Sequence, residues 1–174
     1  MSDSLEQLEA RLGDQRSRRG APPLHLWHPQ LSGEIDIRIA ADGTWYHQGD
    51  PILREPLRNL FASILRREDD GHYYLVTPVE KWRIRVELHP LQVVDVDEQD
   101  GRLVATLNTG LRYLIGDEHP LVPEPSLDGV AVLQLPHGLS ALFARGAWYR
   151  LVAMADSEQR VHSGDYTHQL GAGT

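Results

Sequence analysis

Alternating apolar and polar residues predict short β-strands through much of the chain. Isoleucine occupies every second position of residues 34–39, and the same alternation places Trp82, Ile84 and Val86 on one face of residues 82–87. Because neighbouring side chains of a strand point to opposite faces, both stretches are expected to form strands with one buried face. Turn signals such as Asp-Gly pairs favour antiparallel pairing. Further strands are expected at residues 44–47, 73–77, 93–96, 103–107, 112–115 and 130–135.

A different spacing predicts two amphipathic helices. After Pro56, apolar side chains recur at positions 57, 60, 61, 64 and 65, which form one stripe along a helix. A second core helix is expected from Leu139 to Met154, with Ser140 in its first turn. Its apolar positions are Leu139, Leu142, Phe143, Ala147, Leu151 and Met154. The predicted fold class is therefore α+β, with one or more antiparallel sheets and two amphipathic helices.

The first 33 residues are expected to form a short helix and an extended arm. Leucine recurs at helical spacing in residues 3–13, with Ser4 as the expected N-cap and Gly13 just past the end. Residues 14–33 are rich in arginine, glycine and proline, which is typical of a linker. The expected segments are the helix and arm at 1–33, a first α+β subdomain at 34–98, and a second at 99–174 that ends in a polar tail.

A repeated pattern predicts that the two α+β subdomains are copies of one unit. Residues 43–50 and 110–117 share the pattern Gly-x-x-Tyr-x-x-Gly-Asp. Downstream, residues 57–62 and 139–144 share Leu-x-x-Leu-Phe-Ala. Each copy is then expected to be a hairpin followed by a helix, with an insertion around the proline-rich residues 117–129 in the second. The alternative is coincidence, because glycine, tyrosine and leucine are common at turns and in cores.

Composition narrows the range of functions. Lysine and arginine number 17 and aspartate and glutamate number 25, and the resulting net charge of −8 would repel a polyanion such as nucleic acid. The chain has no cysteine, which excludes disulfides and Cys-type zinc sites. No apolar run approaches the roughly 20 residues that span a bilayer, and the start does not resemble a signal peptide. We therefore expect a cytoplasmic protein with no nucleic-acid or membrane partner.

Candidate metal and catalytic motifs are incomplete. Both His25-x-x-His28 and the pair His162 and His168 lack a fixed acidic third ligand, so loop histidines are expected rather than a metal site. Residues 95–101 resemble a calcium loop, but their glycine comes one position late. Residues 138–142 are similar to a nucleophile elbow but lack its second glycine. The sequence thus predicts no catalytic residue, no bound metal and no cofactor.

A dense polar stretch is the candidate ligand-binding site. It brings the hydroxyl of Thr77, the carboxylate of Glu80 and the amine of Lys81 close together in sequence. Together with Trp45 and Tyr46, these side chains are expected to form a ligand-binding edge beside the sheet. The alternative is a tight turn with an exposed ion pair, which contributes little to stability.

These residues also carry a resemblance to a known family. Matching residues occur at 37–39, 42–46, 49, 51–52, 60–61, 64–66 and, in an unbroken run, 74–81. They are similar to the bacterial domain of unknown function 1285 family, and the resemblance extends over about residues 24–166. It implies an α+β fold with repeated structural motifs and a role in signal transduction, without a known ligand or catalytic residues. The chain departs from the family pattern at residues 88–91 and 106–108.

Three hypotheses of function are consistent with these patterns. The first is a non-enzymatic module that binds a small molecule or a protein and has a regulatory role. The second is a hydrolase that uses histidine with aspartate or glutamate, which predicts a histidine hydrogen-bonded to a carboxylate inside a pocket. The third is a structural subunit of a complex, which predicts an exposed apolar patch or a stable homodimer.

Overall fold

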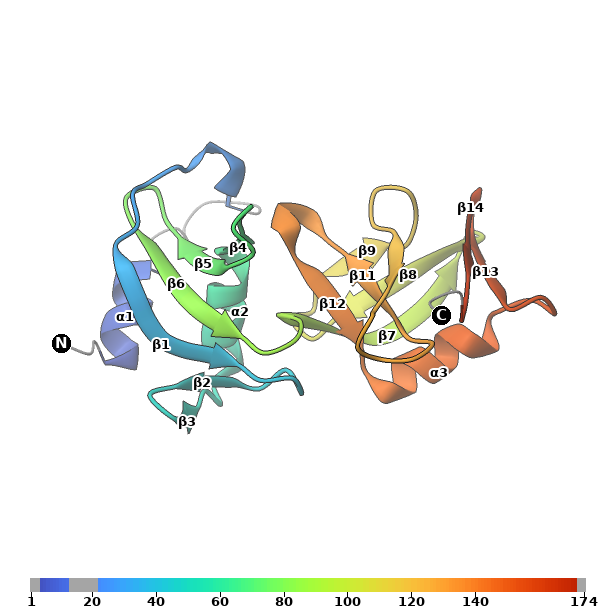
Figure 1. The fold of residues 1–174 in the computed structure, drawn as a ribbon, viewed down its shortest axis with the longest axis horizontal. Coiled ribbons are helices and arrows are strands. Elements are labelled where there is room, and N and C mark those ends of the chain that lie inside the picture. Colours follow the sequence, from blue (N-terminus) through green and yellow to red (C-terminus); the bar gives the residue numbers. More distant parts are fainter. Residues whose placement is uncertain (1–3, 13–21, 172–174) are drawn as a thin grey trace. The chain divides into compact units, whose positions relative to one another are not determined.

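The computed structural model describes residues 4–12 and 22–171 of the chain. The chain forms two compact units, Met1–Leu88 and His89–Thr174 (Figure 1). The expected helix stop at Gly13 and residues 14–21 of the expected linker lie outside the described residues. The boundary between the units follows Leu88, which is earlier in the chain than the boundary expected after residue 98. Residues 91–99 belong to the second unit because they form a strand that pairs with its other strands.

The N-terminal unit combines α-helices with one β-sheet. Its helices are α1 (Leu5–Leu12) and α2 (Glu55–Ser63), with a short 3₁₀ helix at Leu24–Leu26. Its strands are β1 (Gly33–Ile39), β2 (Trp45–His47), β3 (Asp50–Pro51), β4 (Leu65–Arg67), β5 (Tyr73–Val76) and β6 (Lys81–Val86). Helix α1 begins with a capping box, in which Ser4 Oγ accepts from the Gln7 amide and Gln7 Oε1 accepts from the Ser4 amide. The expected N-cap is therefore confirmed.

The strands of this unit form a six-stranded sheet in the order β3-β2-β1-β6-β5-β4. Neighbouring strands are antiparallel except for the central pair, β1 and β6, which runs parallel. The core lies on one face, where Ile37 and Ile39 of β1 are buried together with Leu57 and Phe61 of α2. Figure 1 shows α2 packed behind the sheet. The apolar stripe after Pro56 therefore predicted the presence of this helix, but the helix ends at Ser63, and Leu65, the last position of the stripe, begins β4.

The opposite face of this sheet is covered by charged side chains. Ion pairs connect β1 with β6 and its following residue, at 3.8 Å for Glu34 and Arg83, 3.0 Å for Asp36 and Arg85, and 2.7 Å for Arg38 and Glu87. Exposed pairs of this kind contribute little stability. Their alternation with the buried isoleucines nevertheless fixes which face of β1 meets the core.

The segment between α1 and β1 packs on its own unit where it is described. Leu24 and Trp27 are buried, and the guanidinium of Arg66 fixes the backbone between them. Nη1 of Arg66 donates to the carbonyl oxygens of Leu24 at 2.9 Å and Trp27 at 2.8 Å. Nε and Nη2 of the same side chain donate to one carboxylate oxygen of Glu68. Arg66 of β4 thus holds the middle of the arm, and hydrogen bonds between Ser32 and Lys81 hold its end.

The C-terminal unit has the same number of sheet strands, followed by one helix and a hairpin. The sheet strands are β7 (Leu91–Gln99), β8 (Arg102–Leu107), β9 (Arg112–Leu114), β10 (Leu121–Pro123), β11 (Ala131–Gln134) and β12 (Ser140–Phe143). Helix α3 (Arg145–Ala153) and the hairpin of β13 (Arg160–Ser163) and β14 (Tyr166–Gln169) follow. Arg150 of α3 pairs with Asp95 and Asp97 of β7, and Ser163 Oγ accepts from the Leu103 amide at 2.9 Å. Both elements are therefore tied to the sheet.

The two sheets share one topology. The second sheet has the order β10-β11-β12-β7-β8-β9, and its central pair, β7 and β12, is again parallel. In each unit the first strand lies beside the sixth, the second and third extend to one side, and the fifth and fourth extend to the other. The expectation of purely antiparallel sheets was wrong, because both sheets are mixed. Local turn signals show the hairpins but not the pairing of the first strand with the last.

The duplicated architecture is present, but its expected details were wrong. Residues 43–50 follow the first strand of their unit, whereas residues 110–117 follow the second strand of theirs. The expected second helix begins at Arg145 rather than Leu139, because residues 140–143 form β12. Ser140 therefore starts a strand and does not lie in a helical turn. The helices also differ in place: α2 lies between the third and fourth strands, and α3 follows the sixth.

Candidate functional site

Trp45, one of the expected ligand-binding residues, is part of the core. Its side chain is only 2% exposed, and its ring stacks on that of Phe61 with a centroid distance of 6.2 Å. The neighbouring Tyr46 points to the charged face of the sheet, where the Arg38 guanidinium lies 4.3 Å from its ring centre. The two aromatic side chains therefore face opposite sides of β2.

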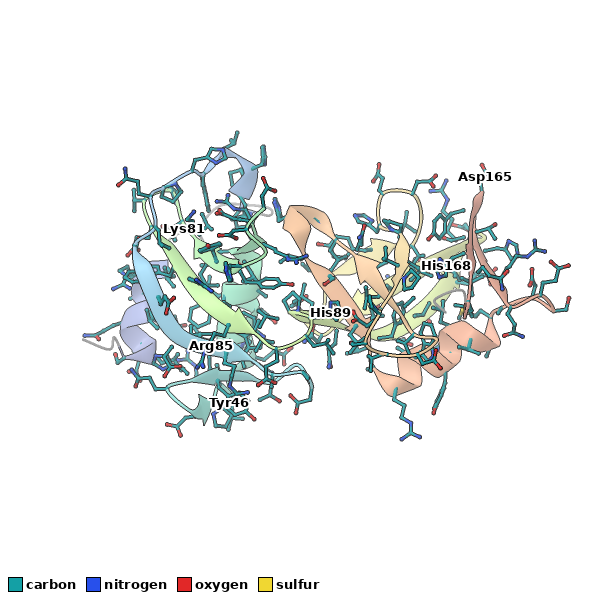
Figure 2. The ribbon with its side chains drawn as sticks, in the orientation of Figure 1. Tyr46, Lys81, Arg85, His89, Asp165 and His168 are labelled. Carbon is teal, nitrogen blue, oxygen red and sulfur yellow. The ribbon has the colours of Figure 1, made fainter. Side chains whose placement is uncertain are left out.

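The other three expected residues share a turn at the far end of the same sheet. Thr77 is buried, and its Oγ1 accepts from the amides of Val79 at 3.4 Å and Glu80 at 3.0 Å. Lys81 donates to Glu68 at 2.8 Å and lies over the Tyr74 ring. Figure 2 shows Tyr46 and Lys81 at separate ends of the sheet. The structure brings Thr77, Glu80 and Lys81 together and leaves both aromatic residues apart from them.

The carboxylate of Glu80 has partners of its own. It accepts from Trp82 Nε1 at 3.3 Å and pairs with Arg11 Nε at 3.1 Å, which links the turn to helix α1. Thr77 and Glu80 therefore hold a tight turn in shape, which was the alternative interpretation of this stretch. A ligand-binding role for the five expected residues stays a prediction.

A cavity of about 210 Å³ lies within the C-terminal unit. Three elements line this partly open cavity: the loop between β10 and β11, helix α3 through Trp148, and the end of β14 from His168. Its walls are Pro123, Glu124, Pro125, Ser126, Leu127, Asp128, Gly129, Val130, Ala131, Trp148, His168, Gln169, Leu170 and Gly171. Most of the predicted proline-rich loop therefore serves as one wall of this cavity.

Charges in this cavity are set by its surroundings. Burial lowers the pKa of His168, so its imidazole is neutral near pH 7. Burial alone would raise the pKa of Glu124, but hydrogen bonds from Ser126 and His89 outweigh it and hold the pKa below its ordinary value. Trp148 packs edge-on against Phe143 with ring centres 5.6 Å apart, which fixes the indole. The cavity thus combines an anion, a neutral imidazole and an aromatic ring.

Glu124 also belongs to a chain of polar side chains that leads away from the cavity. Its second oxygen, Oε2, contacts Nε2 of His89, and Nδ1 of His89 lies 2.6 Å from Ser140 Oγ. His89 lies just before β7, Glu124 just after β10, and Ser140 is the first residue of β12. His89 and Glu124 are 13% and 11% exposed, so the pair is largely shielded from water. Figure 2 labels His89 at this position.

No metal site is found within residues 4–12 and 22–171: these residues contain no group of three or more histidine, aspartate or glutamate side chains placed to hold an ion. His162 instead contacts Asp156 at 2.7 Å and Thr167 at 3.2 Å. Residues 95–99 belong to β7, and Asp100 and Gly101 form the hairpin turn that the sequence favoured over a calcium loop. None of the helices in the described parts of the chain has the length and apolar character to cross a membrane.

The cluster of His89, Glu124 and Ser140 was missed in the sequence. The elbow-like residues 138–142 did single out Ser140, but its position on a predicted helix concealed its neighbours. His89 lies 51 positions from Ser140 and 35 positions from Glu124 in the sequence, so no local pattern connects the three residues. Only the parallel pairing of β7 with β12, which sets Leu91 beside Ala141, brings the two strand starts together.

Comparison with known proteins gives the same two parts. Residues 22–88 match the family model described as the N-terminal domain of the domain of unknown function DUF1285, and residues 90–170 match the C-terminal domain of that family. A crystal structure of a DUF1285 family protein from Silicibacter pomeroyi DSS-3 is 34% identical, with a TM-score of 0.79 over 100% of this chain and 93% of that one.

A second crystal structure, of a DUF1285 family protein from Shewanella baltica OS155, is 30% identical to this chain. Its TM-score is 0.60, over 70% of this chain and 94% of that one. The two family models meet where the structure divides into its units, and both solved structures cover more than two thirds of the chain. The expected resemblance is therefore confirmed: the chain belongs to the DUF1285 family.

Proposed function

We propose that this protein is a ligand-binding module with a regulatory role, and that the cavity of the C-terminal unit receives a small molecule. The observation that carries the proposal is the convergence of Glu124, Trp148 and His168 from three separate elements on one partly open cavity. Polar and aromatic groups that converge in a concave site are typical of binding pockets. A rigid sheet behind them keeps their positions fixed.

The size and chemistry of the cavity favour a small ligand. Drug-sized pockets measure roughly 300–1,000 Å³, and this cavity measures about 210 Å³. Glu124 and Asp128 supply carboxylates to its wall, and the neutral His168 supplies one donor and one acceptor. A metabolite with hydrogen-bond donors or an amino group, and an apolar part for Trp148, fits this wall better than an anion.

A thermal-shift screen with small metabolites tests the proposal. A ligand that binds only the folded state at 100 times its Kd stabilises the protein by about 2.7 kcal/mol. The shift is expected to weaken in Trp148→Ala and His168→Gln and to persist in Tyr149→Ala, an exposed neighbour of Trp148 on α3. A ligand whose shift is equal in all these variants binds elsewhere and would refute the assignment of the cavity.

The expected residues at the N-terminal sheet lead to a separate proposal. Tyr46 and the exposed Arg85 lie on the charged face, which suits a protein partner with complementary charge better than a small molecule, whereas Lys81 is paired with Glu68 and largely shielded. Size-exclusion chromatography with light scattering measures whether that partner is a second copy of the chain. A salt-sensitive dimer that Arg85→Glu weakens would support this reading, and a monomer at all salt concentrations would remove the homodimer.

A further inference from the structure

Ser140, His89 and Glu124 form a continuous hydrogen-bonded chain. His89 lies in the middle, with Nδ1 at 2.6 Å from the Ser140 hydroxyl and Nε2 against the Glu124 carboxylate. The other oxygen of that carboxylate accepts from the amide and the hydroxyl of Ser126, at 3.2 and 2.7 Å. The carboxylate is thus fixed by Ser126, and the imidazole is held between the carboxylate and Ser140, as in a histidine that is oriented for proton transfer.

The proton positions follow from the chemistry of the groups. Glu124 has a lowered pKa and is ionised, so it only accepts hydrogen bonds. Nε2 of His89 therefore carries the proton that is donated to Glu124. In the neutral imidazole, Nδ1 is then left as an acceptor that faces the Ser140 hydroxyl. A serine with its proton directed to an imidazole, and a carboxylate behind that imidazole, resembles the arrangement of an activated nucleophile, with the two ring nitrogens exchanged relative to the serine–histidine–aspartate triad.

The backbone before Ser140 resembles the approach to a nucleophile. His137 and Gly138 have φ angles of 63° and 71°, and the chain enters β12 directly after them. Positive φ at a residue other than glycine costs energy, and such residues are concentrated at functional sites. The turn leaves Ser140 half-buried at the first position of its strand. The Ser140 hydroxyl thus lies at the rim of the sheet rather than within its core.

We propose that Ser140 is a nucleophile for acyl transfer, with His89 as its general base and Glu124 as the residue that positions His89. This inference shares Glu124 with the proposed cavity site but does not require that a ligand binds in the cavity. The substrate class is a small carboxylic ester or thioester. Ser140 Oγ forms a bond to the acyl carbon while its proton moves to His89 Nδ1. The alcohol or thiol leaves and takes that proton, and a water molecule then hydrolyses the acyl-serine with His89 again as the base.

A purely structural role makes different predictions for the same residues. A purely structural hydrogen-bond network between β7, β10 and β12 would stabilise the sheet but would confer no reactivity on Ser140. The chain contains no cysteine, so Ser140→Cys introduces a single thiol. If His89 accepts a proton at this position, that thiol becomes a reactive thiolate near neutral pH. If the network is only structural, the thiol of Ser140→Cys is expected to be no more reactive than the thiol of an exposed cysteine.

The experiment compares labelling of the full chain and of its variants. A fluorophosphonate probe is expected to label Ser140, as read by peptide mass spectrometry, and Ser140→Ala to abolish labelling while the exposed control Ser157→Ala leaves it unchanged. Hydrolysis of p-nitrophenyl acetate is expected to fall by about 10²–10⁴-fold in His89→Gln. Circular dichroism shows whether each variant is folded.

The cysteine variant keeps the test decisive if Ser140→Ala or His89→Gln unfolds. Ser140→Cys is expected to react with iodoacetamide at least about tenfold faster than Ser157→Cys at pH 7, because the imidazole withdraws its proton. When Glu124→Gln is added to Ser140→Cys, the pH dependence of the alkylation rate is expected to move toward higher pH. A purely structural network would not produce this change. No probe labelling of the wild type, together with equal reactivity of the two cysteine variants, would overturn the proposal.

Discussion

Replacing Arg66 with methionine is expected to release the arm from the N-terminal unit. Methionine keeps an apolar stem of similar length, so the main loss is the guanidinium and its bonds. That group is 12% exposed and donates to two carbonyl oxygens of the arm as well as to Glu68. Lys81 remains beside Glu68 at 2.8 Å, so the carboxylate keeps one partner in the variant.

The size of the effect follows from these bonds. Hydrogen bonds to charged groups contribute about 1.5–3 kcal/mol each, and the freed carbonyls recover part of this by contact with water once the arm moves. We expect a loss of about 3 kcal/mol in the free energy of unfolding of this unit. With an m-value of about 2 kcal/mol per molar, the urea midpoint falls by about 1.5 M.

Urea denaturation followed by tryptophan fluorescence measures this loss, and hydrogen exchange localises it. The Trp27 amide, which donates to the Leu24 carbonyl at 3.1 Å, is expected to lose protection first. Arg67→Met is the matched control, because the neighbouring Arg67 is exposed and lies on the other face of β4. Its effect is expected to stay within about 0.5 kcal/mol. Equal effects of both substitutions, with unchanged exchange at Trp27, would refute the anchoring role of Arg66.

The same anchor predicts a pH dependence. Burial tends to raise the pKa of Glu68, but hydrogen bonds from Lys81 and Arg66 lower it by a larger amount. The pKa of Glu68 in the folded protein therefore lies below the ordinary 4.5. Its contribution is fully present above that value and is lost as the pH falls through the folded pKa. The difference in stability between the wild type and Arg66→Met is therefore expected to shrink in acid. A difference that stays constant from pH 7 down to about pH 3 would contradict this assignment.

Other parts of the fold give separate tests. In a spectrophotometric titration, Tyr74 is expected to ionise with a pKa of about 12 because it donates to Asp70, and Asp70→Asn to return that pKa toward 10.0. Ser163→Ala removes the acceptor of the buried Leu103 amide and is expected to cost about 1–3 kcal/mol in urea denaturation, whereas the exposed Ser157→Ala costs little. Phe61→Ala is expected to cost about 3–5 kcal/mol, and a loss below about 1 kcal/mol would show that this ring is not central to the core.

Much of the secondary structure could be predicted because it depends on local patterns. The isoleucines of β1 and the apolar stripe of α2 each fit only one periodicity, and both elements formed, although α2 ends at Ser63, before the last positions of its stripe. Residues 139–143 are consistent with two periodicities, because leucine and phenylalanine at these spacings occur both in helices and in buried strands. The strand formed because Val132 and Leu142 pair across β11 and β12, a contact that local sequence does not show.

The candidate sites were harder to predict for a related reason. Trp45 and Tyr46 are adjacent in sequence, yet alternation along β2 sends one to the core and the other to the charged face. The chemistry of the C-terminal unit depends instead on residues distant in sequence, such as His89 and Ser140. These residues are brought together by the parallel pairing of β7 with β12, which the hairpin signals in the sequence do not predict.

That parallel central pair also orders events during synthesis of the chain. In the N-terminal unit, β1 emerges from the ribosome first but pairs with β6, the last strand of its unit to be made. Chains grow at about 5–20 residues per second, so β1 has an unpaired edge for some seconds while β2 and β3 can already fold onto its other side. An unpaired strand of this kind is prone to join other chains. Expression of fragments that end before β6 is therefore expected to yield aggregates rather than a smaller folded unit.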